Sequence, residues 1–219
     1  MTQEYGMTTW EEAELDTTAM RDGQELDPYM QLQDGPNVVR IITKPAQYIV
    51  HKYKPQNQAY GKNVKCSKPT GTCPLCEQGD KPKKRWLAGV IDRKDGSTAV
   101  LDMGPQIFRS IRELSRDEDY GDPGRYDLNI KVNRKVNGPV GYYTVIAKPP
   151  KPLTEDDLKT KDSFDLASLE KRVNPPSAES VLRRMRKIEG GSSSSSGEDS
   201  EQEGSESVNF TPATDVEDD

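Results

Sequence analysis

The only histidine and all three cysteines of this 219-residue chain fall within one short segment: His51, Cys66, Cys73 and Cys76, the last two in a CPLC turn. A structural zinc site takes four nitrogen or sulfur ligands in a tetrahedron, and a CxxC spacing supplies two of them from one tight turn. The segment is rich in Lys, Gly and Pro and has few apolar residues with which to fold alone. The sequence therefore predicts a zinc subdomain at about 51–80 that folds around one structural Zn²⁺ ion.

Other interpretations of these residues stay open at this point. A CxxC pair also occurs in redox proteins, where it follows a strand and begins a helix in a βαβ unit. The cysteines could be ordinary buried residues, and His51 a bystander whose place is taken by water or by Glu77. A catalytic zinc ion would need an open coordination position and a nearby base, and the chain contains no HExxH or HxE pairing. An odd number of cysteines argues against a disulfide framework and fits a reducing cytosol.

The middle of the chain is rich in short runs of β-branched and aromatic residues, which favour strands. Gly and Pro separate them at turn signals such as Asp95-Gly96, which predicts a hairpin, and Asn137-Gly138. Six runs are typical of strands: 37–43, 47–54, 85–92, 98–103, 125–132 and 141–148.

One helix interrupts these strands. In the segment that begins at Pro105, the apolar residues Ile107, Phe108, Ile111 and Leu114 fall on one helical face. Five or six strands with one helix among them are typical of a small closed barrel, of which the five-stranded oligonucleotide-binding (OB) fold is one. We therefore expect a mainly β protein with a few helices, an OB-fold-like five-stranded barrel carrying the zinc subdomain as an insertion.

The ends of the chain differ from this core. Only 32% of the residues are hydrophobic, so part of the chain cannot bury itself. After a Pro-rich exit we expect helices near 163–173 and 177–188, the second capped by Ser177. The expected organisation is an acidic N-terminal arm (1–34), the OB-like core (35–150), a helical extension packing on the core (151–189) and a disordered acidic tail (190–219).

The charges are sorted along the chain. Residues 1–34 carry a net charge of −8, residues 189–219 carry −10, and residues 35–188 carry +12, within an overall charge of −6. This asymmetry indicates a nucleic-acid partner, with a tail that competes for the basic surface or recruits proteins. The chain has neither the apolar run of a membrane span nor the opening pattern of a signal peptide. We expect a cytoplasmic protein without a membrane partner.

Basic and aromatic residues alternate around the predicted zinc segment. Cations follow phosphates and flat rings stack on exposed bases, which is how proteins bind single strands without reading their sequence. Trp86 fits a core position equally well, and strand alternation places only one of Tyr142 and Tyr143 outside. The candidate DNA-binding residues are Tyr48, Lys52, Tyr53, Lys54, Tyr60, Lys62, Lys65, Lys68, Lys83, Lys84, Arg85, Trp86, Arg109, Arg112, Arg125, Tyr126, Lys131, Arg134, Tyr142 and Tyr143.

With its one His and three Cys inside a basic β-rich core, the HKYKP segment and its acidic end, the chain resembles the T4-type bacteriophage single-stranded DNA-binding proteins over about residues 30–160. The resemblance implies a zinc-containing OB fold that coats DNA during replication, recombination and repair. It also implies His51, Cys66, Cys73 and Cys76 as ligands and a tail that recruits replication and recombination proteins. Family members self-associate on DNA through a basic N-terminal arm, whereas the arm here is acidic.

Two functions of different classes follow. The first is a non-enzymatic coat protein for single-stranded DNA, found in the host cytoplasm if the chain is phage-encoded. The second is a zinc-stabilised adaptor for protein contacts in a replication or transcription assembly. The two differ in whether binding to oligonucleotides is strong and weakens with salt.

Overall fold

The computed structural model describes residues 6–7, 27–56, 58, 61–136 and 140–190. In these residues one antiparallel sheet contains eight strands, seven of four or more residues and the two-residue β1. All six strands predicted from the sequence are present, and β1 and β4 are additions. The strands are β1 (Gly6–Met7), β2 (Gly35–Ile41), β3 (Ala46–Tyr53), β4 (Lys62–Lys65), β5 (Lys83–Asp92), β6 (Thr98–Met103), β7 (Asp127–Val132) and β8 (Tyr143–Ala147).

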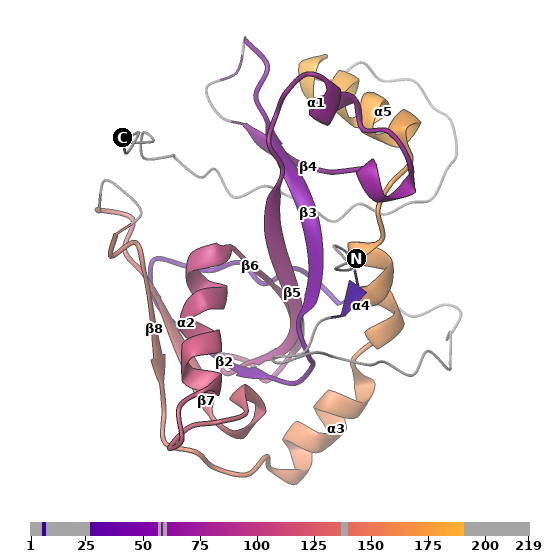
Figure 1. The fold of residues 1–219 in the computed structure, drawn as a ribbon. Helices are drawn as coiled ribbons and strands as arrows, with labels where there is room; N and C mark the ends of the chain where they lie inside the picture. The colour runs from indigo at the N-terminus through magenta and orange to yellow at the C-terminus, as the bar shows by residue number, and fades with distance from the viewer. Residues whose placement is uncertain (1–5, 8–26, 57, 59–60, 137–139, 191–219) are drawn as a thin grey trace.

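A kink between β2 and β3 shapes the sheet. Both strands pair with the same edge of β5, β2 with its second half and β3 with its first. Residues 42–45 bulge opposite residues 88–89, and the Gly89 N–H donates a hydrogen bond to Thr43 Oγ1 at 2.7 Å. A Cβ atom on Gly89 would lie 2.6 Å from the Phe164 ring, so this position requires glycine. The kink divides the sheet into a wing of β2, β7 and β8 and a wing of β3, β4 and β1 (Figure 1).

The predicted closed barrel is wrong. The sheet runs in the order β1-β3-β5-β2-β7-β8, with β4 on β3 and β6 on β5, and it does not close on itself. Helix α2 (Pro105–Ser115) packs against β5, β6 and β8. In a barrel, hydrogen bonds between the edge strands would close the sheet. Here α2 packs against the sheet instead.

The main core lies between α2 and this sheet. Ile107, Phe108 and Ile111 are buried, as the sequence pattern predicted, and Leu114 packs at the margin of the same cluster. The predicted hairpin at Asp95-Gly96 joins β5 to β6. Gly96 adopts a φ of 77°, and its N–H donates to the Asp92 carbonyl at 2.8 Å.

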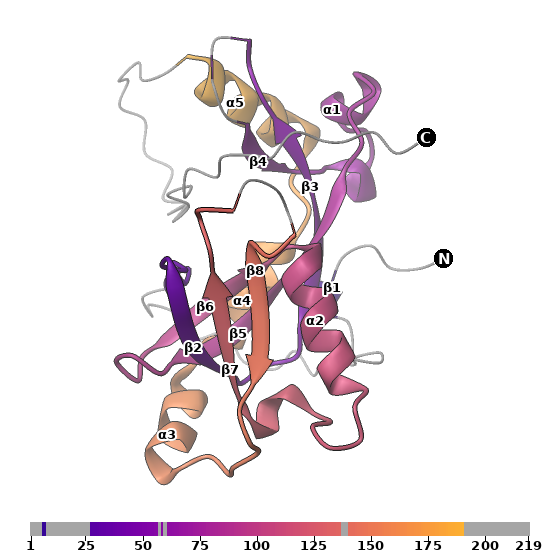
Figure 2. The same ribbon diagram turned by 90° about the vertical axis from the view of Figure 1, so that its left-hand side faces the viewer.

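Three helices follow the sheet: α3 (Glu155–Ser163), α4 (Leu166–Val173) and α5 (Ala178–Glu189). The last two correspond to the helices expected near 163–173 and 177–188, and Ser177 is the N-cap of α5, accepting a hydrogen bond from Ser180 N–H. α4 packs on the sheet through Leu169 and Val173, whereas α5 packs on the β3–β4 wing. In Figures 1 and 2, α5 lies beside α1 (Pro74–Glu77) at the end away from α3.

Some expectations fall outside the described residues: the Asn137-Gly138 turn, the disordered tail beyond residue 190 and most of the N-terminal arm. The arm's end, however, is part of the fold. Val100 N–H donates to the Pro28 carbonyl at 2.8 Å, and Met30 N–H donates to the Val100 carbonyl at 2.9 Å. The Asp27 carboxylate accepts a hydrogen bond from Thr98. Residues 27–30 therefore belong to the folded body.

Candidate metal centre

The β3–β4 hairpin positions the first two candidate ligands. His51 lies in β3 directly opposite Val64 of β4. Cys66 follows β4 at once, and its N–H donates to the Ile49 carbonyl at 2.9 Å. The hairpin thus places the Cys66 thiol beside the His51 ring.

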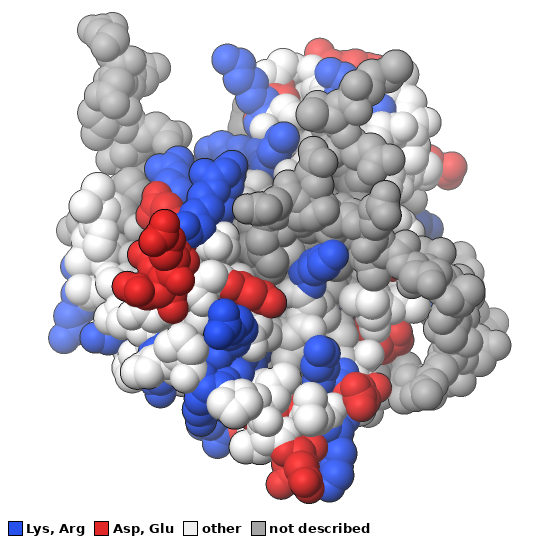
Figure 3. Space-filling model, turned by 60° about the horizontal axis from the view of Figure 1, so that its bottom comes forward, with Lys and Arg blue, Asp and Glu red and all other residues white. Residues whose placement is uncertain are grey.

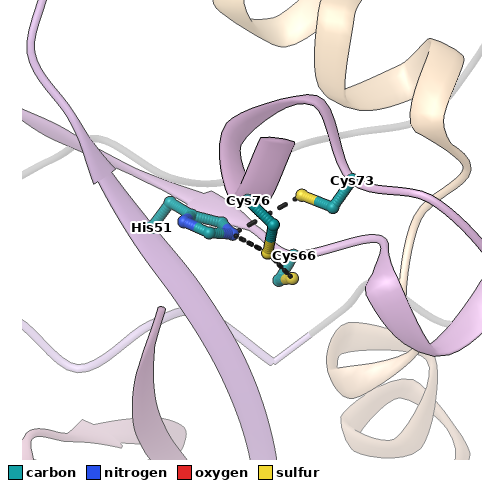
Figure 4. Close-up of side chains that lie close together, drawn as sticks. All are labelled: His51, Cys66, Cys73 and Cys76. Atoms are coloured by element: carbon teal, nitrogen blue, oxygen red, sulfur yellow. Dashed lines mark hydrogen bonds between the residues drawn. The ribbon is translucent and has the colours of Figure 1, made fainter. Parts of the chain in front are cut away.

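The one-turn helix α1 positions the other two. Cys73 is its N-cap and Cys76 its third residue, and Pro74 starts the turn without needing its missing N–H. The loop before it is fixed by the Ser67 hydroxyl, which donates to the Thr72 carbonyl at 2.7 Å. This CPLC turn points both thiols toward His51 (Figure 4).

The distances between the ligand atoms fit a metal ion. His51 Nε2 lies 3.5 Å from Cys73 Sγ and 3.4 Å from Cys76 Sγ, and the Cys66 and Cys76 sulfurs are 3.6 Å apart. A zinc tetrahedron with bonds of about 2.3 Å to sulfur and about 2.0 Å to nitrogen has edges of about 3.8 Å between sulfurs and about 3.5 Å between nitrogen and sulfur. The four ligand atoms all lie within 4.8 Å of one another. This buried cluster can therefore hold a metal ion such as zinc.

The environment of the thiols favours a bound cation. Burial raises the pKa of the Cys66 thiol to about 12, and burial also raises that of Cys76. Burial opposes ionisation of Cys73 too, but hydrogen bonds from backbone N–H groups of Cys76, Ser67 and Leu75 and from the Ser67 side chain outweigh it and lower its pKa to about 6. Three neighbouring thiolates would repel one another in this largely buried site, and a divalent cation would offset that repulsion.

Asp80 is a functional residue that the sequence pattern did not reveal. Its carboxylate lies 2.8 Å from His51 Nδ1, while His51 Nε2 faces the thiols. A carboxylate behind a histidine ligand fixes the ring orientation and the tautomer that leaves the other nitrogen free for the metal. Asp80 is therefore a positioning residue for this cluster. No spacing rule distinguishes it from Glu77, and both acids are exposed.

The structure also addresses the alternative interpretations. The CxxC pair lies on an antiparallel hairpin wing with a third cysteine and a histidine, which is not the βαβ setting of redox motifs. His51 is completely buried within the cluster, so it is not a bystander. The His51 ring occupies the fourth position for which Glu77 was the alternative.

The candidate DNA-binding residues separate by exposure. Tyr60 lies outside the described residues. Tyr53, Lys65, Arg85, Trp86, Tyr142 and Tyr143 are partly exposed. The exposed members are Lys52, Lys54, Lys62, Lys68, Lys83, Lys84, Arg109, Arg112, Arg125, Lys131 and Arg134.

Two aromatic predictions are wrong. Tyr126 is completely buried, and Tyr48 is 7% exposed with its hydroxyl donating to Asp102 at 2.9 Å. Neither ring can stack on a base, because each is packed inside the sheet core and is not accessible from the surface. Trp86 stacks on Phe108 with ring centroids 3.9 Å apart, which makes it part of the core margin.

Two basic residues have structural partners. Arg85 Nε lies 2.9 Å from Asp102 Oδ1. The Lys65 ammonium donates to the carbonyls of Arg172 and Asn174, at 3.3 and 3.5 Å, which ties β4 to the end of α4.

Positive charge is concentrated around the metal cluster. We call residues 44–85 the metal module and residues 86–173 the sheet body. The module carries ten Lys and Arg against two acids, whereas the sheet body carries fifteen of each. Seen from the end away from the module, basic and acidic side chains are interspersed (Figure 3). The metal module therefore carries +8 of the net charge of +12 on residues 35–188, and residues 174–188 carry a further +3.

The metal cluster and α2 lie on the same face of the β3–β5 pair. His51, Ile49 and Gln47 alternate onto one face of β3, and Trp86, opposite Gln47, lies beneath Phe108 of α2. Lys84 pairs with Ile49 and so lies between the two, while Lys83 projects from the opposite face. Figure 2 shows α1 and α2 on one side of the ribbon.

Comparisons with known proteins add no relative: no family model matches the chain, and a search of curated proteins finds no match. Within the described residues, no helix has the length and apolar character needed to cross a membrane. The functional interpretation therefore depends on the geometry and charge of the molecule.

Proposed function

We propose that this chain is a non-enzymatic protein that binds single-stranded DNA through a basic module stabilised by one structural zinc ion. The observation that carries the proposal is the net charge of +8 on the metal module beside a sheet body of net zero. Eight of the module's ten cationic side chains are exposed. Cations gathered in this way release counterions from a phosphate backbone when they bind it.

The donor set supports zinc in a structural role. Three thiolates and an imidazole are ligands that zinc prefers over harder ions such as magnesium or calcium. The four side chains would complete a tetrahedron around the ion and leave no coordination position for a water nucleophile. The ion would supply the rigidity that the loop's own residues lack. These features support a non-catalytic protein over a zinc nuclease or deaminase.

The binding surface would include the face shared by the metal cluster and α2. Lys62 lies opposite Tyr53 and Lys84 opposite Ile49, which places both lysines on the same face as His51. Tyr53 is partly exposed on that face and can offer a ring for stacking. Each stacked base contributes about 1–3 kcal/mol in such proteins.

The test is a fluorescence titration with oligo-dT and with duplex DNA at two salt concentrations. We expect preference for the single strand and weaker binding at high salt. The double variant Lys62→Gln/Lys84→Gln should reduce the slope of log K against log salt by up to about 1.4, or 0.7 for each lost phosphate contact.

The matched control is Lys52→Gln/Lys83→Gln, which removes the same charge from the same region but from the opposite face. The proposal requires this control to bind more tightly than the first variant. Equal losses of affinity in the two variants would show that only the overall charge matters and would contradict the proposed face. An absence of binding at low salt would refute the proposed function.

The acidic tail would recruit protein partners and compete with DNA for the module. Helix α5 ends at Glu189 beside Tyr53, whose hydroxyl donates to the Glu189 carboxylate. The described part of the chain therefore ends next to the module, and the acidic residues follow it in the sequence. Deleting residues 191–219 should tighten DNA binding, mostly at low salt, and equal affinity of both forms would contradict the competition.

One observation favours the second candidate, a zinc-stabilised adaptor for protein contacts. Tyr48 and Tyr126 are buried, so the described surface offers fewer stacking rings than the sequence indicated. An adaptor would bind oligonucleotides weakly and without salt dependence, and it would retain its protein partner after the module's lysines are neutralised.

A further inference from the structure

Helix α5 and the metal ligands share one apolar cluster. The side chains of Val181, Met185 and Ile188 recur at the spacing of one helical face and are at most 7% exposed. They pack with five buried residues of the metal module, two of which are ligands: Ile49, Val64, Cys66, Cys73 and Leu75. The surface on which α5 packs is thus built partly from the ligands themselves.

Polar contacts fasten both ends of the helix to the same region. At its start, the Thr70 hydroxyl donates to the Pro176 carbonyl at 2.9 Å. At its end, the side-chain amide of Gln58 donates to the Ile188 carbonyl, and Tyr53 donates to Glu189. All three donors belong to the metal module.

The preceding helix is held elsewhere. Leu169 and Val173 of α4 are buried against β3, β5 and β6 in a separate apolar cluster. A short linker containing Pro175 and Pro176 joins the two helices, and α5 packs against β4 and α1. The position of α5 therefore depends on whether the loop between Cys66 and Asp80 is ordered.

We propose that α5 is an integral part of the metal centre, so that metal binding and α5 docking stabilise each other. The ion orders the ligand loop and completes the surface under α5, and α5 covers the loop and holds the thiols in place. Such coupling is reciprocal: if the metal strengthens docking by some factor, docking strengthens metal binding by the same factor. This inference rests on the proposed metal and is independent of the proposed binding to DNA.

The coupling has a consequence for the basic surface. α5 carries Arg183, Arg184, Arg186 and Lys187. With the metal bound these cations are held beside the module, and loss of the metal releases them together with the chain that follows. The metal therefore determines the position of a second group of cationic side chains, none of which is a metal ligand.

The first experiment measures zinc affinity by competition with a chromophoric chelator. Val181→Asp/Met185→Asp places charges in the shared cluster without changing a ligand, and we expect zinc affinity to fall about tenfold or more. The matched control is Leu182→Asp, on the same helix at a 38% exposed position, which should bind zinc like the parent protein. Equal affinity of all three proteins overturns the proposal.

The second experiment does not depend on a variant that folds. Hydrogen exchange of the full-length protein is followed with zinc bound and after removal of zinc by a chelator. The coupling predicts that amides of residues 178–189 exchange much faster without zinc, while those of β5 and β6 stay protected. Unchanged protection of α5 refutes the coupling, and a chain that never contains zinc refutes the metal itself, whatever its affinity for DNA.

Discussion

The sheet body and the metal module are stabilised in different ways. The sheet body packs α2 on the sheet around a cluster of thirteen buried residues that also draws on β2, and its charges balance. The metal module offers five buried residues to its own apolar cluster, two of them cysteine ligands, and borrows three from α5. A region that displays many cations has little apolar surface left for a core, and for this reason we propose that an ion and a covering helix stabilise it.

The two regions also differ in the partners of their buried polar side chains. The completely buried Arg40 of β2 lies 2.7 Å, through Nε, from Asp127 of the sheet body, and Arg93 joins Asp127 to Asp157. This network fastens α3 to the neighbouring strands β2 and β7. In the module, His51 and the three cysteines form instead a cluster that can hold a metal ion. The difference predicts that the two regions can be disrupted separately.

The largest expected effect comes from removing a ligand. Cys76→Ser should reduce zinc from stoichiometric amounts to none by elemental analysis and disorder the module, because binding of a structural zinc ion contributes about 10–16 kcal/mol in small domains. Exchange protection of β5 to β7 should remain. Loss of protection throughout the sheet would show that the two regions fold as one unit.

The opposite disruption removes apolar volume from the sheet body. Ile130 is completely buried, and Ile130→Ala should lower the free energy of unfolding in urea by about 2–5 kcal/mol. Zinc affinity measured without denaturant should stay at the parent value, because Ile130 lies outside the cluster around the ligands. A parallel fall in zinc affinity would break the comparison.

The sequence predicted the elements of the sheet body well, because β-branched runs and the Ile107-Phe108-Ile111 face are local patterns. It failed where the outcome depends on distant packing. The bulge at Thr43 and Gly89 and the position of α2 decide that the sheet stays open, and neither follows from periodicity.

In the module, residue type and spacing identified the four side chains that the structure brings together. It missed β4, because KNVK is too polar to be typical of a strand, and it missed Asp80, because a hydrogen bond to His51 Nδ1 depends on three-dimensional placement. It also assigned Tyr48 and Tyr126 to DNA, since composition does not say which face of a strand is covered.

A smaller effect is expected from Asp80, which sharpens the comparison within the module. Asp80→Ala should weaken zinc binding by about 10–100-fold in chelator competition, as loss of a carboxylate behind a histidine ligand does elsewhere. Asp80→Asn keeps an acceptor oxygen, so its zinc affinity should lie between those of the parent protein and Asp80→Ala. Glu77→Ala is the matched control, an exposed acid in the same loop, and should bind zinc normally. Equal losses in the Asp80 and Glu77 variants would contradict the positioning role.

The smallest effect is an acid transition confined to the sheet body. The hydrogen bond from Arg93 is the main cause that lowers the pKa of Asp157 from 3.8 to about 2, so its ionised form stabilises the fold. That contribution is present above pH 4 and is lost as the pH falls toward 2. When the pH is lowered, zinc is released before this window is reached, because protons compete with the metal for the thiolates and the imidazole. In a zinc-free sample we therefore expect the stability of the α3–sheet contact to decline between pH 4 and 2. Hydrogen exchange of the α3 amides measures this decline. Asp157→Asn should be less stable at pH 5 and show a flatter decline, and an unchanged pH profile in that variant would assign the transition to other carboxylates.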